Sequence, residues 1–231
     1  MISFSTKQFA QHHCKMTVEV DAKKHTLNIL QELTYYNQSN DTLSTIVLND
    51  WNNAYSDVNT LLSRRFSDEF VRTFHLAPNY ERGSTNNITI LDDTNLFVTW
   101  ERIPKKTDLL EVKLRNVLLP NQKIKLHLTY SVKIPSNKFT KYGYGDNDEM
   151  NLKNWFLSPA RHENNQFITN SNANLDDIAN AICDYYLEII TPTNFEITSD
   201  LNEIANQKEV TKSTYILSGK NRLDLRLFIE P

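Results

Sequence analysis

Apolar and polar residues alternate with a period of two through most of the chain. The alternation is unbroken over residues 124–134, where every second residue is apolar, and it recurs over 15–20 and 26–37. Successive side chains of a β-strand point to opposite faces, so this period predicts strands with one buried face. The same pattern predicts further strands at 43–48, 88–91, 96–100, 109–114, 185–190, 195–198, 209–217 and 223–229.

One stretch departs from this alternation. Over residues 57–74 the apolar residues follow helical spacing, and Asp57 is the expected N-cap. The pattern predicts one interrupted helix or two short ones, closed by Pro78 and Gly83. A further short helix is predicted at 175–181, where acidic residues stand near the start.

About a dozen strands with little helix predict an all-β fold, either a sandwich or a curved sheet. Short polar turns join the segments 15–20, 26–37 and 43–48, so we expect a three-stranded antiparallel meander there. The sequence VLLPNQ at 117–122 predicts a hairpin turn. No repeat, low-complexity segment or linker divides the chain, so we expect a single domain over residues 1–231.

Composition and charge exclude some classes of partner. A net charge of −3 gives no electrostatic basis for binding nucleic acid or an anionic membrane surface. The longest apolar runs, such as 46–48 and 117–119, are far shorter than a membrane span. The first residues lack the continuous apolar core of a secretory signal. We therefore expect a cytoplasmic protein or a soluble piece of a longer one, and the compartment stays open.

The segment YGYGDNDEMNLKNWFLSPA, residues 142–160, organises the rest of the chain. It holds two of the four glycines and an acidic turn, a combination typical of a sharp chain reversal. Trp155 and Phe156 then begin a new extended segment. One interpretation is a turn followed by a buried aromatic strand. The alternative is a carbohydrate or peptide groove lined by an aromatic set. That set comprises Trp51, Tyr55, Tyr142, Tyr144, Trp155 and Phe156.

Histidines and cysteines give no catalytic or metal-binding pattern. The run HENNQ at 162–166 resembles a zinc-peptidase motif, but Gln166 replaces the second histidine and helical periodicity is absent. His12 and His13 are adjacent, so on a strand they would face opposite sides, and we expect a surface segment there. Cys14 and Cys183 are 169 positions apart and are expected to be buried free thiols.

Carboxylate pairs are the remaining candidates for chemistry. Asp92 and Asp93 stand in an expected turn, and Asp176 and Asp177 near an expected helix start, where acidic residues are common without function. Phosphate-cradling glycine loops and nucleophile elbows do not occur in the sequence. The chain therefore has no expected catalytic residue and no expected metal ligand.

Four segments, taken in order along the chain, carry a resemblance to a known family. They are VEVDAKKHTLNILQELTYYNQSNDTLSTIVLNDWNNAY (18–55), ERGSTNNITI (81–90), KIKLHLTYSVKIPSNKFTKYGYGDNDEMNLKNWFLSPA (123–160) and DYYLEIITPTNFEITSDLNE (184–203). Together they resemble the N-terminal β domain of aminopeptidase N-like zinc metallopeptidases, the gluzincin aminopeptidases, in a bacterial branch. They cover nearly the whole chain.

The resemblance implies a saddle-shaped, curved antiparallel β-sandwich with one short helical excursion, packed on a thermolysin-like catalytic domain. In that family the GxMEN loop, the HExxH motif and a distal glutamate lie downstream, and none of them occurs in this sequence. The chain alone is therefore expected to be inactive and to hold no cofactor, with zinc in the parent's catalytic domain. The expected partner is that catalytic domain, and this chain is expected to contact the peptide substrate only indirectly. Some relatives are secreted and others are tethered to a membrane.

The resemblance also points to candidate substrate-binding residues. In the family, the N-terminal domain lends a residue to the pocket for the substrate's amino terminus, from the region that matches residues 154–157. The candidates here are Asn154, Trp155 and Phe156. The window reads NWFL, so it lacks the glutamine of many relatives, and WFL replaces the branch's WYP and removes a phenolic hydroxyl.

Two functions follow from the sequence. The first is a non-catalytic N-terminal domain of a zinc-dependent aminopeptidase that shapes the active-site cleft and stabilises the catalytic domain. The alternative is a stand-alone β-sandwich module that binds or scaffolds peptide or glycan through its aromatic residues. A chain that is itself a hydrolase would need bound zinc and turnover of an aminoacyl-anilide, and we expect neither.

Overall fold

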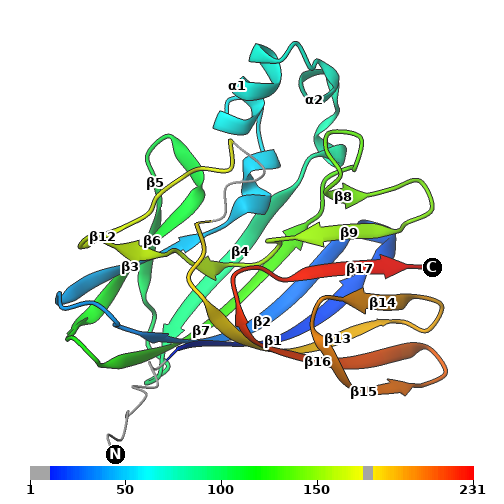
Figure 1. Ribbon diagram of the computed structural model, residues 1–231. Coiled ribbons are helices and arrows are strands. Elements are labelled where there is room, and N and C mark those ends of the chain that lie inside the picture. Colours follow the sequence, from blue (N-terminus) through cyan, green and yellow to red (C-terminus); the bar gives the residue numbers. More distant parts are fainter. Residues whose placement is uncertain (1–10, 174–178) are drawn as a thin grey trace, which may run out of the picture.

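The structure is a computed structural model that describes residues 11–173 and 179–231. A seven-stranded sheet forms its base. The strand order is β15 (Asn202–Lys208), β16 (Lys212–Arg222), β13 (Cys183–Pro192), β1 (His12–Asp21), β2 (Thr26–Tyr36), β7 (Lys123–Lys133) and β4 (Ser84–Asp92), shown in Figure 1. Burial alternates along β1, β2, β7 and β13, as the period of two predicts. Strands β1 and β13 pair in parallel, whereas the other pairs of this sheet are antiparallel.

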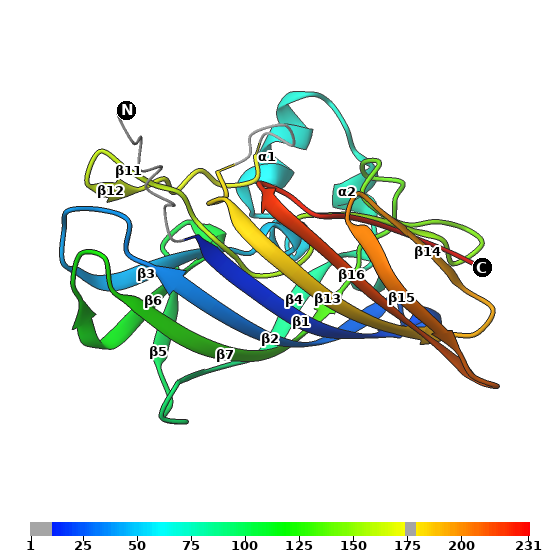
Figure 2. The ribbon, with the colours of Figure 1, turned by 60° about the horizontal axis from the view of Figure 1, so that its bottom comes forward.

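Two smaller sheets and a hairpin lie on one side of this base. One sheet has the order β10 (Ser158–Pro159), β3 (Leu43–Asn49), β6 (Lys106–Leu118) and β5 (Thr99–Ile103). The other has the order β14 (Glu196–Ser199), β17 (Arg226–Glu230), β9 (Met150–Lys153) and β8 (Gly143–Tyr144). The hairpin joins β11 (His162–Glu163) to β12 (Gln166–Phe167). Figure 2 shows the large sheet as a strongly twisted layer.

A single large hydrophobic core joins the three sheets. It takes Met16 and Val18 from β1, Leu48 from β3 and Leu227 from β17, all of them buried. Burying each such side chain stabilises the fold by about 1.5–3 kcal/mol. The continuous core and the dominance of strand confirm the predicted all-β sandwich with one short helical excursion.

The helical excursion consists of two short helices flanked by tighter turns. Its elements are η2 (Trp51–Tyr55), α1 (Leu61–Asp68), α2 (Thr73–Leu76) and η3 (Asn79–Glu81). Of the two predicted alternatives, one interrupted helix or two short ones, the structure has two short helices. The N-cap is not Asp57 but Thr60, whose Oγ1 accepts a hydrogen bond from Ser63 N at 3.2 Å. Asp57 instead accepts from Asn59 N. Phe66 and Phe74 pack with Tyr55 in a second, smaller core under the helices.

The predicted meander is wrong, because the third strand leaves the sheet. Strands β1 and β2 pair with each other, with the turn η1 (Ala22–Lys24) between them, whereas β3 pairs with β6 and β10. The bend is fixed by Asn37, whose Nδ2 donates to the carbonyl oxygens of Asp41 and Leu118. The segment 117–122 is a turn as predicted, but it joins β6 to β7 in a different sheet and so makes no hairpin.

Two other expectations differ from the structure. Strand β15 was not predicted, because all seven of its residues are exposed and so show no alternation. The strand predicted at 209–217 begins later than expected, because residues 209–211 are a turn. The predicted helix at 175–181 lies mostly outside the described residues, and within them Asn180 forms a β-bridge with Ala160. Across the described ranges, helices are too short and too polar to span a membrane.

Candidate functional site

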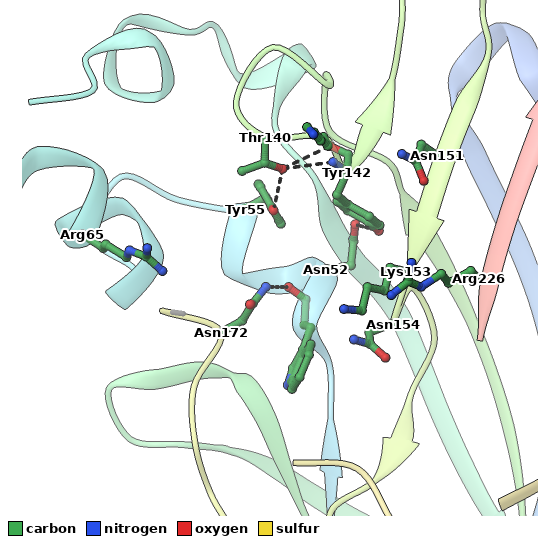
Figure 3. A pocket seen from close by; sticks show the side chains of 12 residues that line it. Asn52, Tyr55, Arg65, Thr140, Tyr142, Asn151, Lys153, Asn154, Asn172 and Arg226 are labelled. Atoms are coloured by element: carbon green, nitrogen blue, oxygen red, sulfur yellow. Dashed lines mark hydrogen bonds between the residues drawn. The ribbon is translucent and has the colours of Figure 1, made fainter. Parts of the chain in front are cut away.

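A pocket of about 410 Å³ opens between the helical excursion and the sheet that contains β9 and β17 (Figure 3). Its walls come from η2, α1, the segment 140–142, β9 and the start of β17. The lining residues are Trp51, Asn52, Tyr55, Arg65, Thr140, Lys141, Tyr142, Asn151, Lys153, Asn154, Asn172 and Arg226.

Aromatic side chains form one wall of this pocket. The rings of Tyr55 and Tyr142 lie 5.4 Å apart, centroid to centroid. The Tyr55 hydroxyl lies 3.0 Å from Thr140 Oγ1, and the Tyr142 hydroxyl donates to Asn52 Oδ1 at 2.7 Å. Burial raises the pKa of Tyr55 to about 12 and raises the pKa of Tyr142 well above its usual value. Both phenols therefore stay neutral and serve as fixed hydrogen-bonding groups.

Positive side chains stand on two sides of the pocket. Lys153 on β9 and Arg226 on β17 are directly paired residues of neighbouring strands. Both approach the carboxylate of Asp224, at 4.0 Å and 3.7 Å. Arg65 comes from α1 on the opposite side, where its Nε contacts Glu69 at 2.8 Å (Figure 3). Lys141 also lines the pocket, and the described lining residues include no carboxylate.

Asn154 ends β9 and turns the chain. Its φ of 53° lies in the left-handed region, which asparagine tolerates better than most residues. Its Oδ1 accepts a hydrogen bond from Nδ2 of the buried Asn180 at 3.0 Å. The residue is only 3 % exposed, and Figure 3 shows its side chain beside Lys153 at the pocket. The turn holds the Asn154 amide at the pocket and sends Trp155 into the core.

The three predicted substrate-binding residues are therefore separated by the structure. Asn154 lines the pocket, whereas Trp155 and Phe156 are buried in the main core. Their rings contact each other edge to face at 5.3 Å, and Phe156 contacts Tyr185 in the same way at 5.6 Å. A direct contact between substrate and either aromatic ring would need the core to open. Substrate binding by Asn154 remains a prediction.

The predicted aromatic groove divides in the same way. Trp51, Tyr55 and Tyr142 line the pocket, so half of the aromatic set comes together. Tyr144 lies elsewhere and stacks on His25 with centroids 3.6 Å apart.

The amide and the cations of the pocket were missed by the sequence analysis. Asn52 and the cations Arg65, Lys153 and Arg226 come from four separate segments. Lys153 directly precedes the candidate Asn154, and Asn52 directly follows Trp51 of the aromatic set, so the sequence carried an indication for these two.

The HENNQ run forms a tight hairpin rather than a helix. Asn164 and Asn165 occupy the two turn positions with φ of 49° and 63°, as a type I′ turn requires. Its His162 ring packs against Phe167 at 4.8 Å. Within the part of the chain that the structure describes, no group of three histidine, cysteine or acidic side chains is placed to hold a metal ion.

His12 corrects the expectation of a surface segment at residues 12 and 13. It lies on the inner face of β1 and is buried, because this strand is central in the large sheet, whereas His13 faces the opposite side and is exposed. Burial lowers the pKa of His12 to about 4, and its Nδ1 accepts from Tyr36 N. Cys14 and Cys183 are buried and free, as predicted, and burial raises the pKa of both thiols.

Comparison with known proteins identifies the fold. The sequence matches no family model and no curated protein. The structure matches a mutant M1 zinc metallopeptidase from Deinococcus radiodurans with a TM-score of 0.52 and 13% identity. It also matches a mutant two-domain M1 zinc metallopeptidase bound to L-tryptophan, with a TM-score of 0.52 and 14% identity.

The match covers nearly all of this chain but a minor part of the solved proteins. It includes 96% of this chain and 41% of the first metallopeptidase, and 95% and 42% for the second. At this identity the likeness establishes the fold. This all-β chain therefore has the architecture of part of the M1 zinc metallopeptidases.

Proposed function

We propose that this chain is a non-catalytic N-terminal domain of a zinc-dependent aminopeptidase. Its role is to shape one wall of the active-site cleft and to stabilise a downstream catalytic domain. The observation that carries the proposal is the fold likeness to M1 zinc metallopeptidases over 96% of this chain. The ordered segment resemblance in the sequence supports the same family.

Exposed apolar side chains on the helical excursion support a docking role. Phe70 is 88% exposed, and Leu76 and Tyr80 are also largely exposed. All three lie on the helical excursion, whose helix α1 supplies Arg65 to the pocket. Exposed apolar residues grouped on one element are typical of a surface that another domain covers. The pocket would then lie next to the domain interface.

Zinc is assigned to the catalytic domain of the proposed parent. The described residues offer no cluster of three metal-binding side chains, so they do not fit a zinc site. No zinc-dependent step is therefore assigned to them. Within the proposal, Asn154 faces the peptide, whereas Trp155 and Phe156 anchor the turn that positions it.

The test is the size and activity of the native protein. An antibody raised against this chain is used to blot and to capture protein from source cells. We expect a band several times heavier than 26.9 kDa, with bound zinc and hydrolysis of an aminoacyl-anilide. The purified 231-residue chain is the control, and we expect it to show neither zinc nor hydrolysis.

A native band at 26.9 kDa without co-captured peptidase activity would refute the proposal. The second candidate function, a stand-alone binding module, would then take precedence. The observation that favours that candidate is the pocket of about 410 Å³ with an aromatic wall, which is within the usual size for small-molecule sites.

A further inference from the structure

The described residues that line the pocket carry charge of one sign. Arg65, Lys141, Lys153 and Arg226 line it, and no aspartate or glutamate among the described residues does. Within the described ranges, Asp224 is the one carboxylate that lies within 4.0 Å of Lys153 or Arg226, at 4.0 Å and 3.7 Å. One carboxylate neutralises one of these two cations, so an excess positive charge remains beside the cavity. A partly enclosed cavity of one sign attracts a ligand of the opposite sign.

Asn154 adds a neutral donor next to this charge. The Asn180 Nδ2 bond to Asn154 Oδ1 fixes which end of the Asn154 amide faces away. The Nδ2 end is therefore the one available at the pocket, where Figure 3 shows it close to Lys153. An ammonium and an amide N–H side by side match the two oxygens of a carboxylate, and charge-assisted hydrogen bonds are the strong class.

The opposite side of the pocket suits an apolar group. The half-buried Tyr142 presents ring surface there, with the buried rings of Trp51 and Tyr55 behind it, and the two phenols already bond to Thr140 and Asn52. Aromatic side chains provide large contact area for a flat or apolar ligand. The volume of about 410 Å³ is within the range for a small molecule.

We infer that this pocket binds a small molecule that carries a carboxylate and an apolar or aromatic group. The carboxylate lies at Lys153 and Asn154, with Arg226 adding charge, and the apolar group lies against Tyr142. The inference does not depend on the proposed aminopeptidase role, because it concerns binding by this chain alone.

The test compares two probes that differ in one group. N-acetyl-L-phenylalanine carries the carboxylate, and N-acetyl-L-phenylalaninamide replaces it with a neutral amide. Each is titrated into the full 231-residue chain by calorimetry and by amide NMR. We expect the acid to bind at least tenfold more tightly than the amide and to shift the amide resonances of Tyr142 and Asn154.

Three variants locate the carboxylate. Lys153→Gln should weaken acid binding at least tenfold. Asn154→Asp retains an oxygen that can accept from Asn180 and retains tolerance of positive φ. It also places a negative charge at the pocket, so binding of the acid should be lost. Lys23→Gln removes the same charge from an exposed turn outside the pocket and should leave acid binding unchanged.

The NMR spectrum of each variant must keep wild-type dispersion, which separates lost binding from lost folding. Equal binding of the acid and the amide, or equal weakening by Lys153→Gln and Lys23→Gln, would overturn the inference. The inference would also be overturned if neither probe shifted the pocket resonances at a concentration 10-fold above a millimolar dissociation constant. A failed aminopeptidase assay of the native protein would leave these results intact.

Discussion

Asn180 links four segments of the chain through one buried side chain. Its Oδ1 accepts hydrogen bonds from Asn49 Nδ2 at 2.7 Å and from Ser158 Oγ at 2.8 Å. Its Nδ2 donates to Asn154 Oδ1 and to the Leu223 carbonyl, both at 3.0 Å. These bonds use both acceptor sites and both donors of the amide, and the residue has no exposed surface. We expect its replacement to destabilise the fold and to release the Asn154 amide.

The magnitude follows from the partners that Asn180→Leu would leave behind. Asn49 keeps a second bond to the Ala179 carbonyl at 3.3 Å, and Leu223 is partly exposed, so water can replace its bond. Ser158 Oγ and Asn154 Oδ1 lose their bonds to Asn180 in buried surroundings. Each buried orphan costs about 1–3 kcal/mol, so the two together lower the unfolding free energy by about 2–6 kcal/mol, with a central value of about 4 kcal/mol.

Urea unfolding followed by tryptophan fluorescence measures this loss. With a slope of about 2–3 kcal/mol per molar urea, the midpoint of Asn180→Leu should fall by about 1.5 M. Asn206→Leu on the exposed strand β15 is the matched control and should change stability by less than about 0.5 kcal/mol. A loss below about 1 kcal/mol for Asn180→Leu would refute the view that this amide holds the four segments together.

Three further predictions test the core and its buried titratable groups. Trp155→Ala should cost about 3–5 kcal/mol in chemical unfolding, because it leaves a cavity in the main core, and a loss under 1 kcal/mol would contradict that burial. Cys14 and Cys183 should resist Ellman's reagent in the native state and react after denaturation, since burial keeps both as thiols; rapid native labelling would contradict this. His12 should titrate near pH 4 by NMR. Because the pKa of His12 is lowered in the fold, its contribution to the unfolding free energy is fully present above pH 6.5 and is lost as the pH falls toward 4. The loss is about 3 kcal/mol, and the His12→Gln variant should not show this pH dependence.

Strand positions were readable from the sequence because burial alternates in the large sheet. The segment 124–134 corresponds to β7 (Lys123–Lys133), and 26–37 to β2 (Thr26–Tyr36). The helical spacing over 57–74 also reports a real burial stripe, in which Phe66 and Phe74 face the second core. In each case the local period and the tertiary environment agree, so the prediction holds.

Strand partners were not readable in this way. A period of two states which face of a strand is buried and says nothing about its neighbour. The third strand therefore seemed to continue a meander, whereas the Asn37 bend carries it into another sheet. The same limit hides the parallel pairing of β1 with β13, whose residues are about 170 positions apart.

The pocket was largely unreadable for a related reason. Asn154 was identified through a family resemblance, but Arg226 and Arg65 reach the same cavity from distant positions in the chain. Each is an ordinary surface cation in its own local sequence. Trp155 shows the opposite error, because an aromatic residue beside a candidate site is as compatible with a core as with a groove, and here it is buried.

The two sides of the molecule differ in what they offer a partner domain. The outer face of the large sheet presents polar side chains such as Lys15 and Glu19 and the ion pair of Lys125 with Glu32 at 2.9 Å, with Leu30 and Tyr186 exposed among them. A domain docking there would have to desolvate these charges, which is costly unless each is paired again. The helical excursion instead exposes apolar groups such as Phe70, whose burial is favourable. We therefore propose that the catalytic domain of the parent contacts the side of the excursion, the side on which the cationic pocket also opens.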